Sequence, residues 1–256
     1  MIIDSVPIWG LLAATIALVV AALELGFRMG RRHQLRAEGK TEVSGAMVGA
    51  TMGLLAFMLA FTFNAAAGRH EARKAMVVEE ANAIDQTWLR AGLLVEPYRT
   101  GIRSLLKDYV DVRVQAVAGK VPLAEALRQS VILQDRMWTM AEAAGRQDPG
   151  SITTGLFIQS LNEVIDLHVK RVTVAVRNRI PETIWAALYL LMLSGMLMMG
   201  TQVGLSGKRH VGMELALAVS FSLVLFVIAD LDRPQEGLIN VSQQAMVELQ
   251  ARLNAR

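Results

Sequence analysis

Four long runs with few or no charged residues constrain this chain more than any other feature of its sequence. Each run is long enough to cross the hydrocarbon core of a bilayer as a helix, which takes about 20 residues. The runs are Pro7–Phe27, Ser44–Ala67, Thr183–Leu205 and Val211–Ala229. One such run is also typical of a buried helix in a soluble protein, but four in a chain of 256 residues predict a multi-pass membrane protein.

The stretches between these runs predict an all-α architecture. We expect membrane spans one and two in residues 1–67, a soluble helical domain in 68–180, spans three and four in 181–232, and a C-terminal tail in 233–256. Within the soluble part, apolar residues recur at helical spacing and breaks fall at Glu96-Pro97, Gly119–Pro122 and Gly145–Gly150. Ser151 is expected to cap the helix that leads toward span three.

The stretch from Leu54 to Ile84 changes from apolar to charged without a proline or a glycine cluster between the two halves. A helix can therefore continue from span two into water without interruption. The sequence predicts one long helix that belongs to both the membrane part and the soluble part of the chain.

Basic residues gather at the edges of the predicted spans. Arg28, Arg31, Arg32, Arg36 and Lys40 follow span one, while Lys208 and Arg209 separate spans three and four. This placement favours lipid headgroups as partners over nucleic acid, and aromatic residues make up only 5% of the chain. Both loops lie on one side of the membrane and carry positive charge. Basic residues on the other side, next to the soluble domain, are nearly as numerous. The positive-inside rule therefore does not determine the side of that domain.

Span two contains small, aromatic and amide residues, and their order has two interpretations. Small residues such as Gly45 and Gly49 let helices approach closely in lipid, which indicates a packing helix. Alternatively, Gly53, Phe57, Phe61 and Asn64 lie along one side. If several copies surround an axis, the aromatic rings form an apolar constriction that gates by dewetting, with Asn64 as a polar ring at its mouth.

The charged half of the same helix offers candidate vestibule residues. They are Arg69, Arg73, Glu79 and Glu80. Rings of charge can attract or repel ions before a constriction, although an ordinary solvated helix surface explains most such charges equally well.

The run "FTFNAAAGRHEAR" from Phe61 to Arg73 resembles the end of the second span of bestrophins. Nearly the whole chain resembles a bacterial bestrophin-like membrane family, through Glu71–Ile84, Leu105–Arg113 and Asp230–Ile239. Bestrophins are pentameric anion channels, so the resemblance implies a pentameric ring in a bacterial inner membrane, with span two lining the pore and a hydrophobic neck near Phe57 and Phe61. The residues themselves leave anion or cation selectivity open.

Animal bestrophins bind calcium through an acidic cluster after the fourth span, and the resemblance places Asp230, Asp232 and Glu236 in that region. Calcium takes six to eight oxygen ligands, so three carboxylates need further partners. The alternative is that "DLDRPQEG" is only the turn that ends span four.

The residues predict no enzyme. The four histidines are scattered, and "GAMVGATMG" lies inside a span without the Lys-Ser/Thr of a phosphate-binding loop. Two functions stay open. One is an oligomeric ion channel, and the other is a membrane sensor or scaffold whose soluble helices bind a partner or ligand.

Overall fold

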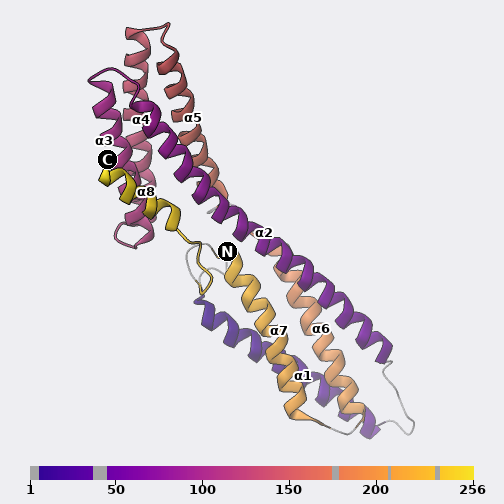
Figure 1. Ribbon diagram of the computed structural model, residues 1–256. Coiled ribbons are helices and arrows are strands. Elements are labelled where there is room, and N and C mark those ends of the chain that lie inside the picture. Colours follow the sequence, from indigo (N-terminus) through magenta and orange to yellow (C-terminus); the bar gives the residue numbers. More distant parts are fainter. Residues whose placement is uncertain (1–5, 37–44, 175–178, 207–208, 234–236) are drawn as a thin grey trace. The chain divides into compact units, whose positions relative to one another are not determined.

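The computed structural model describes residues 6–36, 45–174, 179–206, 209–233 and 237–256 (Figure 1). Within these ranges the chain forms helices and no strands. The helices are α1 (Ile8–Arg36), α2 (Gly45–Ala91), α3 (Tyr98–Val117), α4 (Leu123–Gln147), α5 (Ile152–Val172), α6 (Glu182–Ser206), α7 (Val211–Asp232) and α8 (Gln244–Ala255). The all-α prediction is confirmed.

Four of the described helices are long and apolar enough to cross a membrane. They are α1, α2, α6 and α7, and they contain the four apolar runs of the sequence. The prediction of four spans, with a helical insertion between the second and third, is therefore confirmed. Span two also continues as predicted, because α2 is a single helix of 47 residues.

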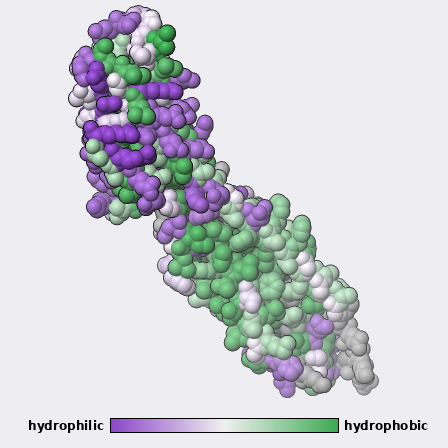
Figure 2. Space-filling view, in the orientation of Figure 1, coloured by the Kyte–Doolittle hydropathy of each residue, from purple (hydrophilic) through white to green (hydrophobic). Residues whose placement is uncertain are grey.

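The chain divides into two compact units. The first consists of residues 1–70 and 179–240, and the second of residues 71–178 and 241–256. The last residues, which the sequence presents as a tail, include α8, whose Met246, Leu249 and Leu253 are buried in the core of the second unit. Figure 2 shows hydrophobic side chains over the membrane helices and many hydrophilic ones over the second unit.

Glycines bring α1 and α6 of the first unit into backbone contact. A Cβ atom built on Gly200 would overlap the carbonyl oxygen of Leu23, and one built on Gly204 would overlap that of Phe27. Gly26 and Gly30 are equally close to α6. Small residues are the usual means of close helix packing in lipid, where burial of apolar surface gives no driving force. The buried side chains of α2 and α7 join this pair to complete the core of the unit.

The second unit is a helical bundle. Its core joins α2, α3, α4, α5 and α8 through large apolar residues such as Ile84, Leu106, Met137 and Phe157. Ser151 caps α5 as predicted, since its hydroxyl accepts a hydrogen bond from the backbone N–H of Thr154 at 3.2 Å.

Candidate pore-lining helix

One face of α2 is exposed throughout the first unit. The exposed fraction is 66% for Phe57 and 63% for Phe61, and Gly53 and Asn64 are exposed as well. These residues recur every three or four positions, which is the spacing of one helix face. We call Gly53, Phe57, Phe61 and Asn64 the α2 stripe.

The opposite face of α2 packs against the other membrane helices. Leu55, Leu59 and Ala66 are buried in the core of the first unit, and the hydroxyl of Thr62 is satisfied by the carbonyl of Met58 at 2.7 Å. The described part of the chain therefore leaves the α2 stripe open.

The same period of exposed residues continues within the second unit. There the exposed positions of α2 include Glu71, Ala75, Val78, Asn82 and Gln86. Their spacing is again three or four residues, so the helix keeps one side open along most of its length.

The four predicted vestibule charges divide into two groups. Glu79 is exposed, and Arg69 keeps 29% of its side chain exposed while its Nη1 lies 3.8 Å from an oxygen of Asp232. Arg73 and Glu80 differ from the prediction, because both side chains are buried. Arg73 donates to the carbonyl of Val174 at 3.5 Å. The two buried charges do not line an aqueous surface of this chain.

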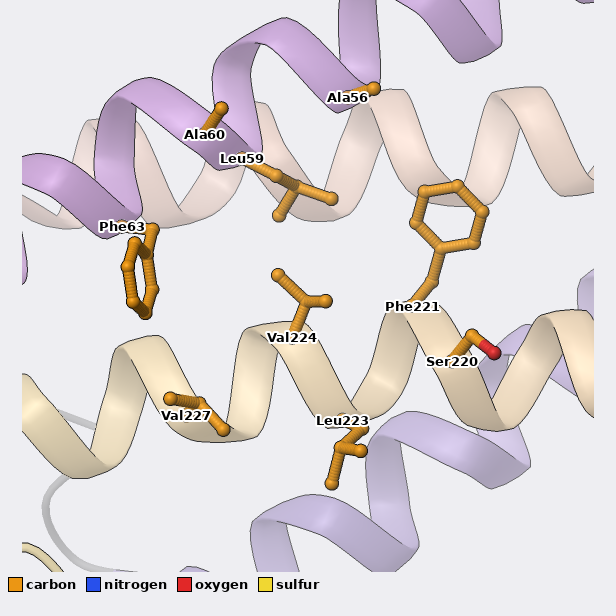
Figure 3. A pocket seen from close by; sticks show the side chains of 9 residues that line it. All are labelled: Ala56, Leu59, Ala60, Phe63, Ser220, Phe221, Leu223, Val224 and Val227. Carbon is orange, nitrogen blue, oxygen red and sulfur yellow. The ribbon is translucent and has the colours of Figure 1, made fainter.

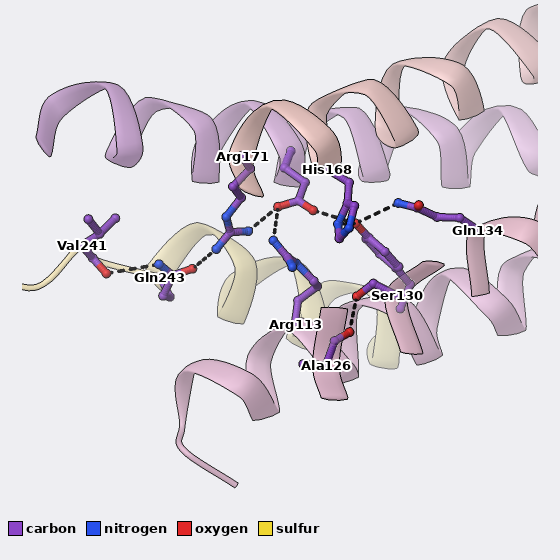
Figure 4. Close-up of polar contacts among 10 residues, drawn as sticks. Arg113, Ala126, Ser130, Gln134, His168, Arg171, Val241 and Gln243 are labelled. Carbon is purple, nitrogen blue, oxygen red and sulfur yellow. Dashed lines mark hydrogen bonds and ion pairs between the residues drawn. The ribbon is translucent and has the colours of Figure 1, made fainter. Parts of the chain in front are cut away.

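Glu80 lies at the centre of a buried polar network in the second unit, and Figure 4 labels its partners Arg113 and Arg171. Its carboxylate accepts hydrogen bonds from the Tyr109 hydroxyl at 2.8 Å and from Arg113 at 3.2 Å, and it pairs with Arg171. Arg171 also donates to the side-chain oxygen of Gln243 at 2.6 Å. The network thus joins α2, α3 and α5 to the segment that precedes α8.

Charge and burial compete in this network. Burial opposes ionisation of Glu80, but Arg113 and Arg171 outweigh it and hold the pKa of the carboxyl below its usual value. Burial, followed by the nearby Arg113, lowers the pKa of His168 to about 4. The His168 ring lies 3.1 Å from the Tyr109 hydroxyl and is neutral at pH 7. Every charged member has an opposite partner, so the network is suited to holding the bundle together.

A family model described as "Bestrophin-like domain" matches residues 13–246. The chain belongs to the bestrophin-like family. Its fold also matches crystal structures of a bacterial bestrophin homologue from Klebsiella pneumoniae. One of them, a point variant, has a TM-score of 0.68 and 14% identity over 97% of this chain and 98% of the other.

A second crystal structure of that homologue, with another point mutation, has a TM-score of 0.65 and 13% identity over 96% and 99% of the two chains. The crystal structure of a membrane protein with a point mutation from proline to alanine has a TM-score of 0.68 and 13% identity, with 97% of each chain covered. At such identities the likeness establishes the bestrophin-like fold. No curated protein matches the sequence.

The acids in the last turn of α7 of this bestrophin-like chain bind protein donors. Asp230 accepts hydrogen bonds from the backbone N–H groups of Leu238 and Ile239, both at 2.8 Å. Asp232 accepts from the N–H of Ile180 at 3.1 Å, in addition to its contact with Arg69. Glu236, the third predicted ligand, lies outside the described residues.

These contacts decide how well the described acids fit a calcium ion. The carboxylate oxygens face N–H donors and a guanidinium, whereas calcium requires a shell of oxygens. No group of three or more His, Cys, Asp or Glu in the described part of the chain could hold a metal ion. Asp230 and Asp232 therefore fit a structural turn at the end of α7 and do not fit a calcium ion.

An apolar groove of about 600 Å³ lies between α2 and α7 in the first unit (Figure 3). It is lined by Ala56, Leu59, Ala60, Phe63, Ser220, Phe221, Leu223, Val224 and Val227. The hydroxyl of Ser220 is satisfied by the carbonyl of Ala216 at 2.8 Å, so the groove presents almost only hydrocarbon. The sequence predicts both helices but not this groove, because it forms between segments about 160 residues apart in the chain.

Proposed function

We propose that this bestrophin-like chain is one subunit of a ring-shaped ion channel, most simply a pentamer, in which the α2 stripe lines the pore. The observation that carries the proposal is the exposure of Phe57 and Phe61 on a side of α2 that the described part of the chain leaves uncovered. Large apolar side chains ringed around an axis form a neck that blocks ions when it loses its water.

The position of the stripe along the chain supports this proposal. Helices that only pack in lipid can be exposed on any side, but here the open side of α2 carries an amide at Asn64 and then charge at Glu71. A polar amide on the lipid-facing surface of a span is unfavourable, whereas Asn64 suits a water-filled pore and Glu71, beyond the span, suits its mouth.

The charges that remain exposed on α2 indicate how ions would be selected. Glu71 and Lys74 lie 3.6 Å apart with 70% and 54% of their side chains exposed, and Glu79 is exposed further along. With Arg73 buried, this side of α2 in the second unit carries more carboxylate than cation. We therefore assign the proposed channel a mouth that favours cations.

Basic residues at the end of α1 complete the proposal for the membrane. Arg28, Arg31 and Arg32 are exposed there, and clusters of this kind attract the anionic headgroups of lipids. We place the protein in the bacterial inner membrane on the basis of this pattern, its four spans and its family.

Ion flux through purified protein in liposomes tests the proposed function. Phe57→Ala should widen the neck and raise the flux, while Leu190→Ala should leave it unchanged, because Leu190 is an exposed apolar residue of α6. Absence of flux from both the wild type and Phe57→Ala, with the oligomer intact, would contradict the channel and favour the sensor or scaffold.

A further inference from the structure

The α2–α7 groove and the α2 stripe lie on neighbouring parts of one helix surface. Successive residues of a helix are about 100° apart, so Phe57 and Asn64 point within about 20° of each other. Relative to their mean direction, Ala60 lies about 50° to one side and Phe61 about 50° to the other. Ala60 lines the groove, and Phe61 projects from the opposite side with 63% of its surface exposed.

A ring of identical subunits brings these two sides together. In a ring of five subunits, the direction from one subunit to the axis and the direction to either of its two neighbours differ by about 54°. If Phe57 and Asn64 face the axis, Phe61 points at one neighbour and Ala60 at the other. The two residues differ by one position, or about 1.5 Å along the helix, so rotational symmetry puts them at the same level.

Size and surface chemistry also match. Ala56 and Ala60 are small and exposed, which leaves room for a ring between α2 and α7. A helical side chain leans toward the N-terminus of its helix, so Phe61 would cover both alanines of its neighbour. Val224, 40% exposed on α7, would border the same ring.

We propose that a second copy of this chain occupies the α2–α7 groove, through insertion of its Phe61 between α2 and α7 of the adjacent subunit. This inference rests on the proposed function, because it requires Phe57 and Asn64 of the α2 stripe to face the axis of a ring, while Phe61, at the edge of the stripe, faces a neighbour. The contact is heterologous: each subunit gives its Phe61 to one neighbour and receives a Phe61 from the other.

Disulfide cross-linking tests the contact in a chain that has no cysteine of its own. Phe61→Cys and Ala60→Cys chains with different affinity tags are co-expressed, purified as mixed oligomers and oxidised. The interface predicts covalent pairs that carry both tags. Each single variant expressed alone should stay monomeric under denaturing conditions, and so should Ala60→Cys mixed with Leu190→Cys.

A second variant tests the contact without oxidation. Ala60→Trp places a large ring where Phe61 of the neighbour would enter, so most of the protein should dissociate to monomers in size-exclusion chromatography with light scattering. Leu190→Trp should assemble like the wild type. Normal assembly of Ala60→Trp would overturn the interface.

The outcomes separate this inference from the proposed function. An oligomer that conducts ions but forms no mixed-tag pairs would overturn the interface and leave the channel standing. Modification of its Ala60→Cys by a membrane-soluble maleimide would then assign the groove to lipid chains. Covalent pairs from Phe61→Cys alone would indicate a like-to-like contact and would also contradict the interface. A monomeric wild type without flux would overturn both proposals.

Discussion

The Tyr109 hydroxyl donates a 2.8 Å hydrogen bond to the Glu80 carboxylate, and both side chains are completely buried. This contact connects the long helix α2 to α3. Because Arg113 and Arg171 bind the same carboxylate, Glu80 balances one buried and one largely buried positive charge. A carboxylate in such a position matters for stability, and its neighbour Glu79 provides a direct comparison.

Glu80→Ala should strongly destabilise the second unit. Removal of one partner from a buried ion pair leaves an uncompensated charge, which costs about 3–5 kcal/mol, and here two arginines lose their partner. Glu79→Ala, at an exposed position, should stay within about 0.5 kcal/mol of the wild type. Thermal unfolding in detergent measures both variants. Equal melting temperatures would show that the network contributes nothing to stability.

Acid should weaken the second unit through His168. Its folded pKa is about 4, below the usual 6.5, so the unfolded chain takes up this proton first as the pH falls. Stability is therefore full above pH 6.5 and declines toward pH 4, by at most about 3 kcal/mol. Glu80, whose pKa is lowered, adds a further loss only below its usual value of 4.5.

The variant His168→Gln removes that proton-binding group. Between pH 6.5 and 4.5 its unfolding free energy should vary with pH less steeply than that of the wild type. His33→Gln, an exposed change on α1, should keep the wild-type slope. The same slope for His168→Gln would show that His168 does not cause the acid sensitivity.

Gly200→Ala should disrupt the packing of α1 against α6. The added methyl group would meet the backbone of Leu23, which cannot yield as a flexible side chain can, so the two helices must separate. Gly212→Ala is the matched control, because a Cβ there meets no atom within 4 Å and alanine favours a helix by up to about 1 kcal/mol. Fluorescence-detected size-exclusion chromatography should show loss of folded protein for Gly200→Ala only.

Exposed charges on α2 should set the ion preference of the proposed channel. Glu71→Gln should lower the permeability ratio of sodium to chloride, and Lys74→Gln should raise it, because the two charges lie 3.6 Å apart on the same surface and act with opposite sign. Reversal potentials in bilayers under a salt gradient measure the ratio. Shifts in the same direction for both variants would contradict a mouth on this side of α2.

The helices could be predicted from the sequence, whereas the buried charges could not. Span two continues to Ala91 because no breaker interrupts it, which is a local property. Glu80 is bound by residues 29, 33 and 91 positions away, and no local pattern reports such partners. One signal was present: Glu80 is in phase with Val77 and Ile84, both buried, and a charge on an apolar face indicates a buried pair.

The C-terminal helix illustrates the same limit. The apolar pattern of α8 is moderate, and its packing into the second unit becomes clear only from its contacts there. Its Gln250 binds Asp111 at 2.6 Å, and Arg252 and Arg256 bind Asp85. These contacts join residues that are about 140–170 positions apart in the chain. Tertiary contacts of this range, more than helix propensity, decide that residues 244–255 belong to the second unit.

Access of a charged thiol reagent to single cysteines on the α2 stripe would test the central claim most directly. The chain has no other cysteine, so Phe57→Cys, Asn64→Cys and the control Leu190→Cys can be compared in the same liposome flux assay. If the α2 stripe lines the pore, a negatively charged methanethiosulfonate should change the flux of the two stripe variants and leave the control unchanged. Unchanged flux at both stripe positions, with their modification shown by mass spectrometry, would contradict a pore lined by α2.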